Sequence, residues 1–134
     1  MELNKKTEYA IAAMVDIAKQ GNEKLVASKD IAERQSIPPK FIPQIIHALS
    51  KGKLITSIRG AGGGVKLNNK ADEINLKQII ELIEGPIQVN FKKKKKGDPK
   101  MNETLQKLEE TVVKEFEKVT ISELSGSGNK KWFW

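Results

Sequence analysis

Apolar residues recur at helical spacing in several stretches of the chain, and they alternate as in a strand in one place. Residues 6–19 carry an apolar stripe that one face of a helix would bury, with Thr7 as a candidate cap. A second helix is predicted over 75–84, where Asn75 can cap the first turn. A third runs from about 98 to 119, and its apolar positions repeat at the four-three spacing that suits a partner helix. The pattern therefore predicts a mainly helical fold.

Two shorter helices are predicted between Ser28 and Lys51, around a tight corner. Ser28 is the expected N-cap of the first, because its hydroxyl can accept a bond from a first-turn amide. The corner holds two adjacent prolines, and the second, Pro39, suits the first position of the next helix, where a missing N–H costs nothing. Gly52 stops that helix. This is the helix-turn-helix arrangement, whose second helix can enter a major groove.

A small β-hairpin is predicted directly after these helices. Residues 54–58 and 65–67 are rich in β-formers, and a glycine-rich tip with a single arginine, Arg59, joins them. Gly60 and Gly62 permit a close backbone approach, and Arg59 suits phosphate oxygens or a narrow minor groove. A nucleotide-binding loop fits poorly because the glycines open into a strand and not a helix. A flexible hairpin tip explains the glycines equally well, so only Arg59 beside a helix-turn-helix favours a DNA-binding wing.

Composition narrows the class of protein. The 134 residues carry a net charge of +7, which favours a polyanionic partner. There is no cysteine and only one histidine, so disulfides, thiolate metal sites and zinc sites are not expected, and no base–nucleophile pair suggests an enzyme. No apolar run approaches the length of a membrane span, and no signal peptide precedes the first helix, so a cytoplasmic protein without membrane contact is expected.

Four segments of the chain together carry a family resemblance. They read T-E-Y-A-I-A-A-M-V-D-I-A, I-A-E-R-Q-S-I-P-P-K-F-I-P-Q-I-I, S-I-R-G-A-G-G-G-V-K-L and I-I-E-L-I-E-G-P-I. They resemble the Rrf2 family of bacterial winged-helix transcription regulators, over roughly residues 1–90. The resemblance implies a fold that is mainly α with a small β-hairpin: a winged helix-turn-helix followed by a long C-terminal dimerisation helix, assembled as a two-fold homodimer.

The resemblance also implies DNA contacts on the first helix, the second helix of the helix-turn-helix and the hairpin. Gln44 can pair bidentately with adenine, and Lys40 can reach guanine or a phosphate. Lys5 and Lys6 stand just before the first helix, where relatives contact phosphate, although a solvated chain start explains them as well; Phe41 has a core position as its alternative. The predicted DNA-binding residues are Lys5, Lys6, Ser28, Pro39, Lys40, Phe41, Gln44, Arg59, Gly60 and Gly62.

Two residues depart from the pattern of the family. Glu8 stands where relatives often carry a basic residue, and a carboxylate there would repel phosphate. Pro43 replaces a carboxylate that could accept a bond from cytosine, so the base preference should differ. In a helix that begins at Pro39, Pro43 would also remove one intrahelical hydrogen bond. His47, further along this helix, is expected to point into solvent.

The segment after the hairpin domain is rich in lysine where cluster-bearing relatives carry three cysteines. An iron–sulfur cluster needs such thiolates, so neither a cluster nor any other cofactor is expected. The leading interpretation of the lysines is a solvated loop. A phosphate contact is the second, and an anionic membrane surface is a distant third.

The chain ends in three aromatic residues on a flexible Ser-Gly linker. Because two indoles and a phenyl ring are costly to leave in water, Trp132, Phe133 and Trp134 are candidates for binding a ligand or a partner, and a cloning remnant is the alternative. The predicted layout is a winged-helix domain, a lysine-rich loop, a dimerisation helix and a linker with an aromatic tail, at residues 1–89, 90–100, 101–124 and 125–134.

The combined prediction is a cluster-free, dimeric, sequence-specific DNA-binding transcription regulator. It would repress from a palindromic operator in double-stranded DNA and respond to a small molecule or a partner enzyme. The alternative is a winged-helix module that binds RNA or a partner protein, with the aromatic tail docking an enzyme.

Overall fold

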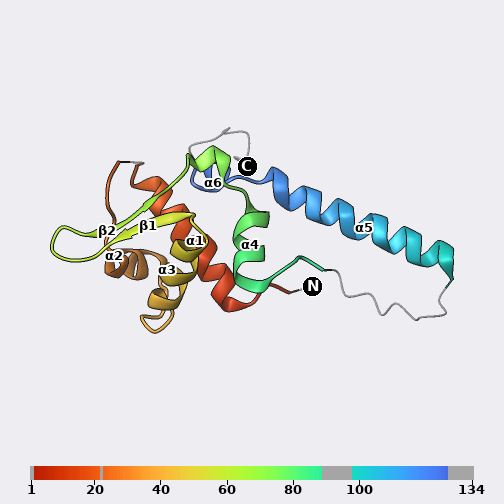
Figure 1. Ribbon diagram of the computed structural model, residues 1–134, viewed down its shortest axis with the longest axis horizontal. Coiled ribbons are helices and arrows are strands. Elements are labelled where there is room, and N and C mark those ends of the chain that lie inside the picture. Colours follow the sequence, from red (N-terminus) through yellow and green to blue (C-terminus); the bar gives the residue numbers. More distant parts are fainter. Residues whose placement is uncertain (1, 22, 89–97, 127–134) are drawn as a thin grey trace.

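The computed structural model describes residues 2–21, 23–88 and 98–126 and confirms the predicted fold class (Figure 1). Within these residues the chain is mostly helical and carries one two-stranded antiparallel hairpin. The elements in order are α1 (Lys5–Lys19), α2 (Ser28–Gln35), α3 (Ile42–Lys51), β1 (Ile55–Ile58), β2 (Gly64–Leu67), the 3-10 turn η1 (Ala71–Glu73), α4 (Leu76–Glu84), α5 (Pro99–Lys118) and α6 (Ile121–Leu124).

Helix α1 is the centre of the core. Its predicted apolar stripe is buried, with Ala10, Ala13 and Met14 fully inaccessible to solvent. The stripe contacts α2, α3, α4, α6 and β2. Two alanines on one face let neighbouring helices approach closely, so a single helix organises elements from both ends of the chain.

The first turn of α1 differs in detail from the prediction. Asn4, not Thr7, is the N-cap, and its Oδ1 accepts from the backbone N–H of Thr7 at 2.8 Å and from the Thr7 hydroxyl at 2.9 Å. Thr7 is fully buried inside the helix. Asparagine is as good a cap as threonine, and starting the helix here satisfies the buried hydroxyl. Lys5 and Lys6 therefore lie in the first turn and not before it.

The corner between α2 and α3 corrects two predictions. Ser28 does not cap α2; it is the first helical residue, and the N-cap, Ala27, provides no side-chain bond. Pro39 lies in the turn, and α3 begins only at Ile42, which places Pro43 in its first turn. The reason is that a proline is tolerated only at the start of a helix, so the later proline sets the beginning. No intrahelical bond is lost to Pro43, contrary to the prediction.

The hairpin has the predicted place and form. β1 and β2 pair in an antiparallel register from Ile55 opposite Leu67 to Ile58 opposite Gly64. Val26, just before α2, adds a bridge to Val65, with reciprocal N–H to carbonyl bonds of 2.8 Å. This bridge attaches β2, close to the tip end of the hairpin, to the segment that precedes α2.

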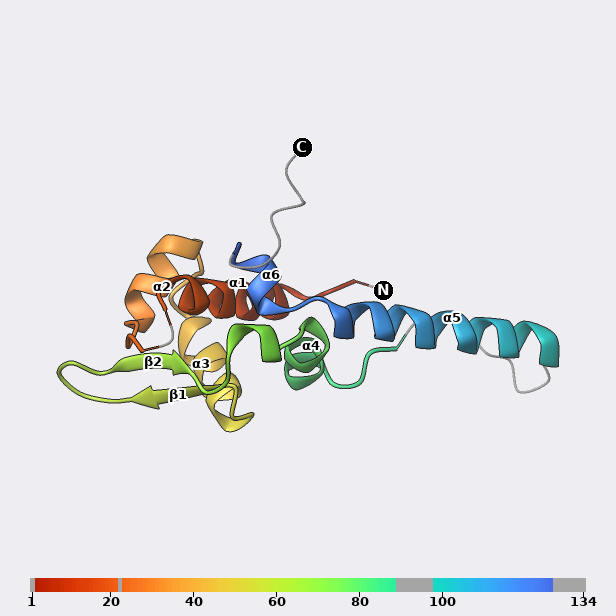
Figure 2. The same cartoon turned by 90° about the horizontal axis from the view of Figure 1, so that it is seen from above.

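Helices α4 and α5 begin where the sequence predicts. Asn75 and Gln78 form a reciprocal capping box on α4, and Asp98 caps α5 by accepting from the N–H of Lys100 at 2.9 Å. Figure 2 shows α5 and the hairpin extending in opposite directions from the body formed by α1, α3 and α4. α5 has no buried residue in the described chain.

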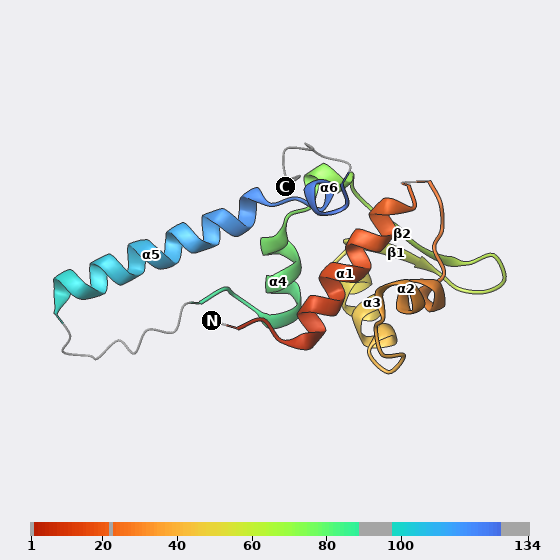
Figure 3. The same cartoon turned by 180° about the vertical axis from the view of Figure 1, so that it is seen from behind.

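The chain returns to the body after α5, as Figure 3 shows from behind. Thr120 caps the one-turn helix α6, whose residue Ile121 is fully buried and donates its N–H to the carbonyl of Ile74 at 2.8 Å. The N–H of Leu76 donates to the carbonyl of Val119 at 2.9 Å. The segment that follows the hairpin is thus bonded to the segment that follows α5.

One buried ion pair holds α2 on α1. Asp16 is only 2% exposed and accepts from Arg34 through two bonds, Nε to Oδ1 at 2.9 Å and Nη2 to Oδ2 at 2.8 Å. Gln35 adds a bond to Oδ1 at 3.2 Å. Burial opposes ionisation of this carboxyl, but the hydrogen bonds from Arg34 and Gln35 and the positive charges of Arg34 and Lys19 outweigh it and lower the pKa of Asp16.

Asp16→Asn should lower the free energy of unfolding by about 1–2 kcal/mol at pH 7, because one charged bidentate pair is lost and the guanidinium is partly exposed. Since the folded-state pKa of Asp16 is lowered, its contribution is complete above the ordinary carboxyl pKa of about 3.9 and is lost as the pH falls through the lower folded value. Urea unfolding of parent and variant should therefore differ at pH 7, and should differ less at a pH below 3.9. Glu8→Gln, which breaks only the exposed pair with Lys5, is the control and should leave stability unchanged. If the free energies of unfolding of parent and variant differed equally at both pH values, the loss would come from packing and not from charge.

Candidate nucleic-acid interface

Helix α3 divides its residues between the core and the surface. Ile45 and Leu49 are fully buried, whereas Pro43, Gln44 and His47 are exposed. Nε2 of Gln44 donates to the carbonyl of Lys40 at 3.3 Å, a long bond that a base edge can replace. The exposed face of α3 therefore presents one side-chain amide and one imidazole to solvent.

Lys40 and Phe41 lie in the turn before α3, and Phe41 is partly buried. Its ring packs on Tyr9 of α1, with 5.4 Å between ring centroids and 43° between ring planes, and Nζ of Lys40 stands 5.1 Å from the ring centroid. Phe41 thus packs against the core cluster, which was the alternative interpretation of the sequence, and its ring also lies beside Lys40 at the entrance to α3. Its predicted DNA contact stays a prediction.

At the hairpin tip the side chain of Arg59 is exposed to solvent. Gly60 and Gly62 are exposed and have φ of 98° and 77°, the left-handed region that favours glycine. The tip is therefore shaped by its glycines, and its one cation, Arg59, is exposed and forms no side-chain hydrogen bond or ion pair with the described residues.

The predicted DNA-contact residues near the starts of α1, α2 and α3 lie on different parts of the surface. Lys5 and Lys6 are on the first turn of α1, where Lys5 pairs with Glu8 at 3.2 Å and that hydrogen bond raises the pKa of Lys5. Ser28 and Pro39 belong to the helix-turn-helix, and both line one apolar groove between α2 and α3, of about 590 Å³. Glu33 also lines this groove, and its carboxylate would repel an anion bound there.

A second groove lies between α3 and the hairpin, with a volume of about 450 Å³. Sequence analysis found two of its residues, Ser28 and Arg59, and missed three others, His47, Ser50 and Ser57. Their residue types did not predict a shared groove, because α3, β1 and the start of α2 come together only in the folded chain.

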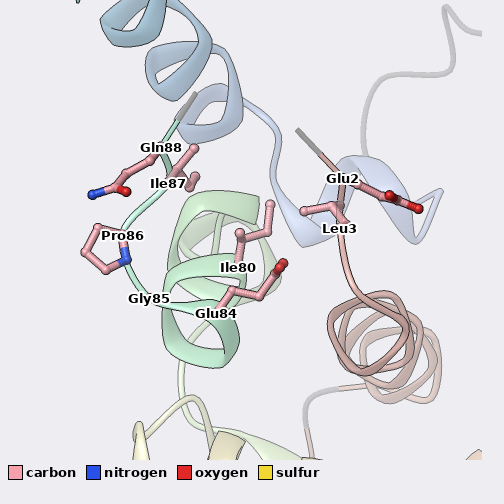
Figure 4. Close-up of a pocket in the computed structure, with 8 residues that line it drawn as sticks. All are labelled: Glu2, Leu3, Ile80, Glu84, Gly85, Pro86, Ile87 and Gln88. Carbon is pink, nitrogen blue, oxygen red and sulfur yellow. The ribbon is translucent and has the colours of Figure 1, made fainter. Parts of the chain in front are cut away.

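A third hollow, of about 210 Å³, lies where the chain leaves α4 (Figure 4). Its apolar wall comes from Leu3, which points toward Ile80, and from Ile87. Glu2 and Glu84 add carboxylates at the edge. It is far smaller than the groove beside α3 and lies at the end of α4, the helix against which α5 packs.

The residues present do not fit a metal centre or an iron–sulfur cluster. The sequence contains no cysteine, and the described residues bring together no group of three or more metal-binding side chains. A cluster held by thiolates therefore has no ligands in this chain. The described chain also contains no helix that is both long and apolar enough to cross a membrane.

A helix-turn-helix with a basic hairpin beside it defines a winged-helix DNA-binding protein. A model of the Rrf2 family, described as an iron-dependent transcriptional regulator, matches residues 3–127, so the chain belongs to this family. Its relatives include the HTH-type transcriptional regulator IscR of Aliivibrio salmonicida, 39% identical over 84 residues, 63% of this chain and 50% of that protein. Protein rrf2 of Nitratidesulfovibrio vulgaris is 37% identical over 91 residues, 66% of this chain and 61% of that protein.

Solved structures agree in fold over nearly the whole chain. CymR of B. subtilis, described as the global cysteine regulator, superposes with a TM-score of 0.85 at 26% identity, covering 96% of this chain and 99% of that one. IscR of T. potens superposes with a TM-score of 0.77 at 25% identity, covering 100% of this chain and 93% of that one. The chain spans about half the length of the IscR sequence first named. The names of these relatives and solved structures describe regulators of transcription.

Proposed function

We propose that the protein is a homodimeric transcription repressor that reads a palindromic operator and works without an iron–sulfur cluster. The observation that carries the proposal is the combination of an exposed recognition helix, α3, with a long helix, α5, whose apolar seam is not buried by the part of the chain that the structure describes. A two-fold dimer presents two copies of α3 to half-sites about one helical turn apart, and such an operator has matching two-fold symmetry.

In this proposal α3 reads bases and the hairpin contacts the flanking minor groove. Gln44 is the base reader, because it is exposed and carries both a donor and an acceptor. Lys40, held beside Phe41, and Arg59 at the hairpin tip supply charge toward phosphates. Lys5, Lys6, Ser28, Pro39, Gly60 and Gly62 are the remaining proposed contact residues.

The surface of α5 supports dimerisation. Met101 and Leu108 are 47% and 49% exposed, and they share one helix face with Leu105, Val112 and Phe116. A 20-residue helix with no buried side chain is marginal in water, since helices in proteins are stabilised mainly by packing of their apolar face. The four-three spacing favours packing of this apolar face against α5 of a second copy of the protein.

The contacts between α4 and α5 support control by an effector near the dimer helix. Nζ of Lys77 on α4 lies 3.3 Å from Glu81 and 3.4 Å from Glu117 of α5, and these hydrogen bonds raise the pKa of Lys77. A ligand in the hollow at Glu84 would act on the same helix, α4, at the end opposite Lys77, and a partner protein could act there as well. It would shift the spacing of the recognition helices only by the difference in its affinity for two arrangements. Trp132, Phe133 and Trp134 lie outside the described residues.

We propose repression because a dimer can block transcription simply by occupying its operator. This requires only the elements that bind DNA and the helix that forms the dimer. The RNA- or partner-binding alternative has no described surface that favours it over DNA. Binding by a purified protein to duplex sequences recovered by selection, compared with single-stranded RNA of the same length, tests the proposal directly.

Replacing Leu108 and Val112 together by Glu should give monomers that bind operator DNA weakly, because four carboxylates would meet across the seam of the dimer. Sedimentation measures the assembly, and a DNA-binding titration measures the affinity. The double variant Gln106→Glu with Lys114→Gln is the matched control, since it changes the charge equally on exposed positions away from the seam. A double Glu variant that sediments like the parent would overturn the proposed dimer surface.

Arg59→Ala and Gln44→Ala should weaken DNA binding in different ways. Loss of the wing cation should lower the affinity for all sequences and reduce the slope of log affinity against log salt by about one unit. Loss of Gln44 should cost about 1–3 kcal/mol at one base position and relax the preference there. Lys100→Ala, on α5 and away from the interface, is the control for charge. Parent-like binding by both variants at every sequence and salt concentration would show that the recognition surface lies elsewhere.

Deletion of residues 129–134 tests whether the aromatic tail takes part in effector control. DNA affinity would be measured with and without a panel of metabolites and a purified candidate enzyme. If the tail senses the effector, the deletion should retain the bare affinity and lose the response. Identical responses with and without the tail would exclude it from sensing.

A further inference from the structure

The face of α3 that points away from the core begins with an apolar residue. Ile45 and Leu49 are fully buried on one side of the helix. Helical geometry places Pro43, Gln44 and His47 on the other side, and all three are exposed. Pro43 and Gln44 stand together in the first turn but differ in chemistry. The side chain of Gln44 carries hydrogen-bond donors and an acceptor, whereas that of Pro43 carries neither.

Pro43 lies between the two grooves that flank α3. It lines the groove toward α2, of about 590 Å³, and also the groove toward the hairpin, of about 450 Å³. Ile42 and Pro43 are the two residues of α3 that line both grooves, and Ile42 is buried. Pro43 is therefore the exposed side chain of α3 that separates the grooves at the start of the helix, and the N-terminal residues of a recognition helix are the ones that contact base edges.

The start of α3 is poorly suited to a phosphate. The first turn of a helix usually attracts an anion through its free backbone N–H groups. Pro43 has no N–H, so one of these donors is missing from the exposed side of the turn. Glu33 lines the groove toward α2 and adds a negative charge there. A base edge therefore suits the surface at Pro43 better than the DNA backbone does.

The apolar ring of Pro43 discriminates among the four bases. The C5-methyl of thymine is the apolar group that base edges present in the major groove. A proline ring gains free energy by covering this methyl group, because both surfaces are removed from water. The same ring placed over the amino, carbonyl or ring-nitrogen groups of the other bases would leave a polar group without a hydrogen-bond partner. Attraction and desolvation both favour thymine.

We infer that Pro43 is a specificity-determining residue that contacts the C5-methyl of one thymine in each half-site of the operator. The inference rests on the proposed DNA-binding function and gives the operator part of its sequence. Pro43 and Gln44 are successive residues at the start of one helix. The thymine should therefore lie at a base pair that neighbours the adenine with which Gln44 can pair.

The test removes the methyl group alone. An operator obtained by selection with the full chain is synthesised again with uracil in place of each thymine in turn, which keeps the base pair and loses only the C5-methyl. For the parent, one such position in each half-site should weaken binding about four-fold, and about fifteen-fold when both half-sites are changed, as expected for one buried methyl group per half-site.

Pro43→Ala should weaken binding to the natural operator, and uracil at the sensitive position should then add less than about two-fold further loss. A purely structural role of Pro43 would not remove the sensitivity to a single methyl group on the DNA. Pro99→Ala is the matched control, because Pro99 is also an exposed proline in the first turn of a helix, α5, and lies outside α3. This variant should retain the four-fold effect of uracil.

Pro43→Glu tests the same position by the gain of a different preference. A carboxylate at this place can accept a hydrogen bond from the N4 amino group of cytosine and has nothing to gain from a methyl group. Selection with this variant should therefore replace the thymine by cytosine and keep the neighbouring adenine. Continued selection of thymine by Pro43→Glu would contradict the inference.

Two further results would overturn the inference and leave the proposed function intact. One is a parent protein whose binding is unaffected by uracil at every thymine of the half-site. The other is a Pro43→Ala variant that keeps the full sensitivity of the parent to uracil, which would assign the methyl contact to another residue. Failure of the parent to select any duplex sequence would overturn the proposed function itself.

Discussion

The ion pair between Asp16 and Arg34 fixes the arrangement on which the DNA-binding surface depends. A carboxylate that is 2% exposed must be matched by donors, and Arg34 and Gln35 at the end of α2 supply three bonds to it. Because these donors stand at the last turn of α2, they hold the position from which the chain turns into α3. The apolar contacts of α1 are not directional and would tolerate a rotated α2, whereas a bidentate guanidinium–carboxylate pair tolerates little.

The recognition helix and the hairpin are attached to this platform by separate means. α3 is anchored by Ile45 and Leu49 in the core, and the hairpin by the bridge of Val65 to Val26. These two attachments place α3 and the hairpin on either side of one groove. A protein that reads two grooves of DNA at once needs this kind of fixed spacing, because bases on one side and phosphates on the other must be met in register.

Membership of the Rrf2 family gives this chain a DNA-reading fold without the thiolates that an iron–sulfur cluster requires. The long helix α5 is nevertheless joined to the DNA-binding body at its end, through the bonds from Leu76 to Val119 and from Ile121 to Ile74. Ile74 follows the hairpin by only a few residues. These backbone hydrogen bonds join the end of α5 to the segment between the hairpin and α4.

The sequence alone determined the class of fold and most of its elements, because local signals set them. The capping box at Asn75, the start of α5 at Asp98 and the glycine-rich hairpin tip depend on residues a few positions apart. The start of α3 was misplaced by three residues, because two prolines competed for the first turn and only the packed helix decided between them. The Asp16–Arg34 pair and the groove at Ser57 could not be predicted, since their partners are distant in sequence and meet only through tertiary packing.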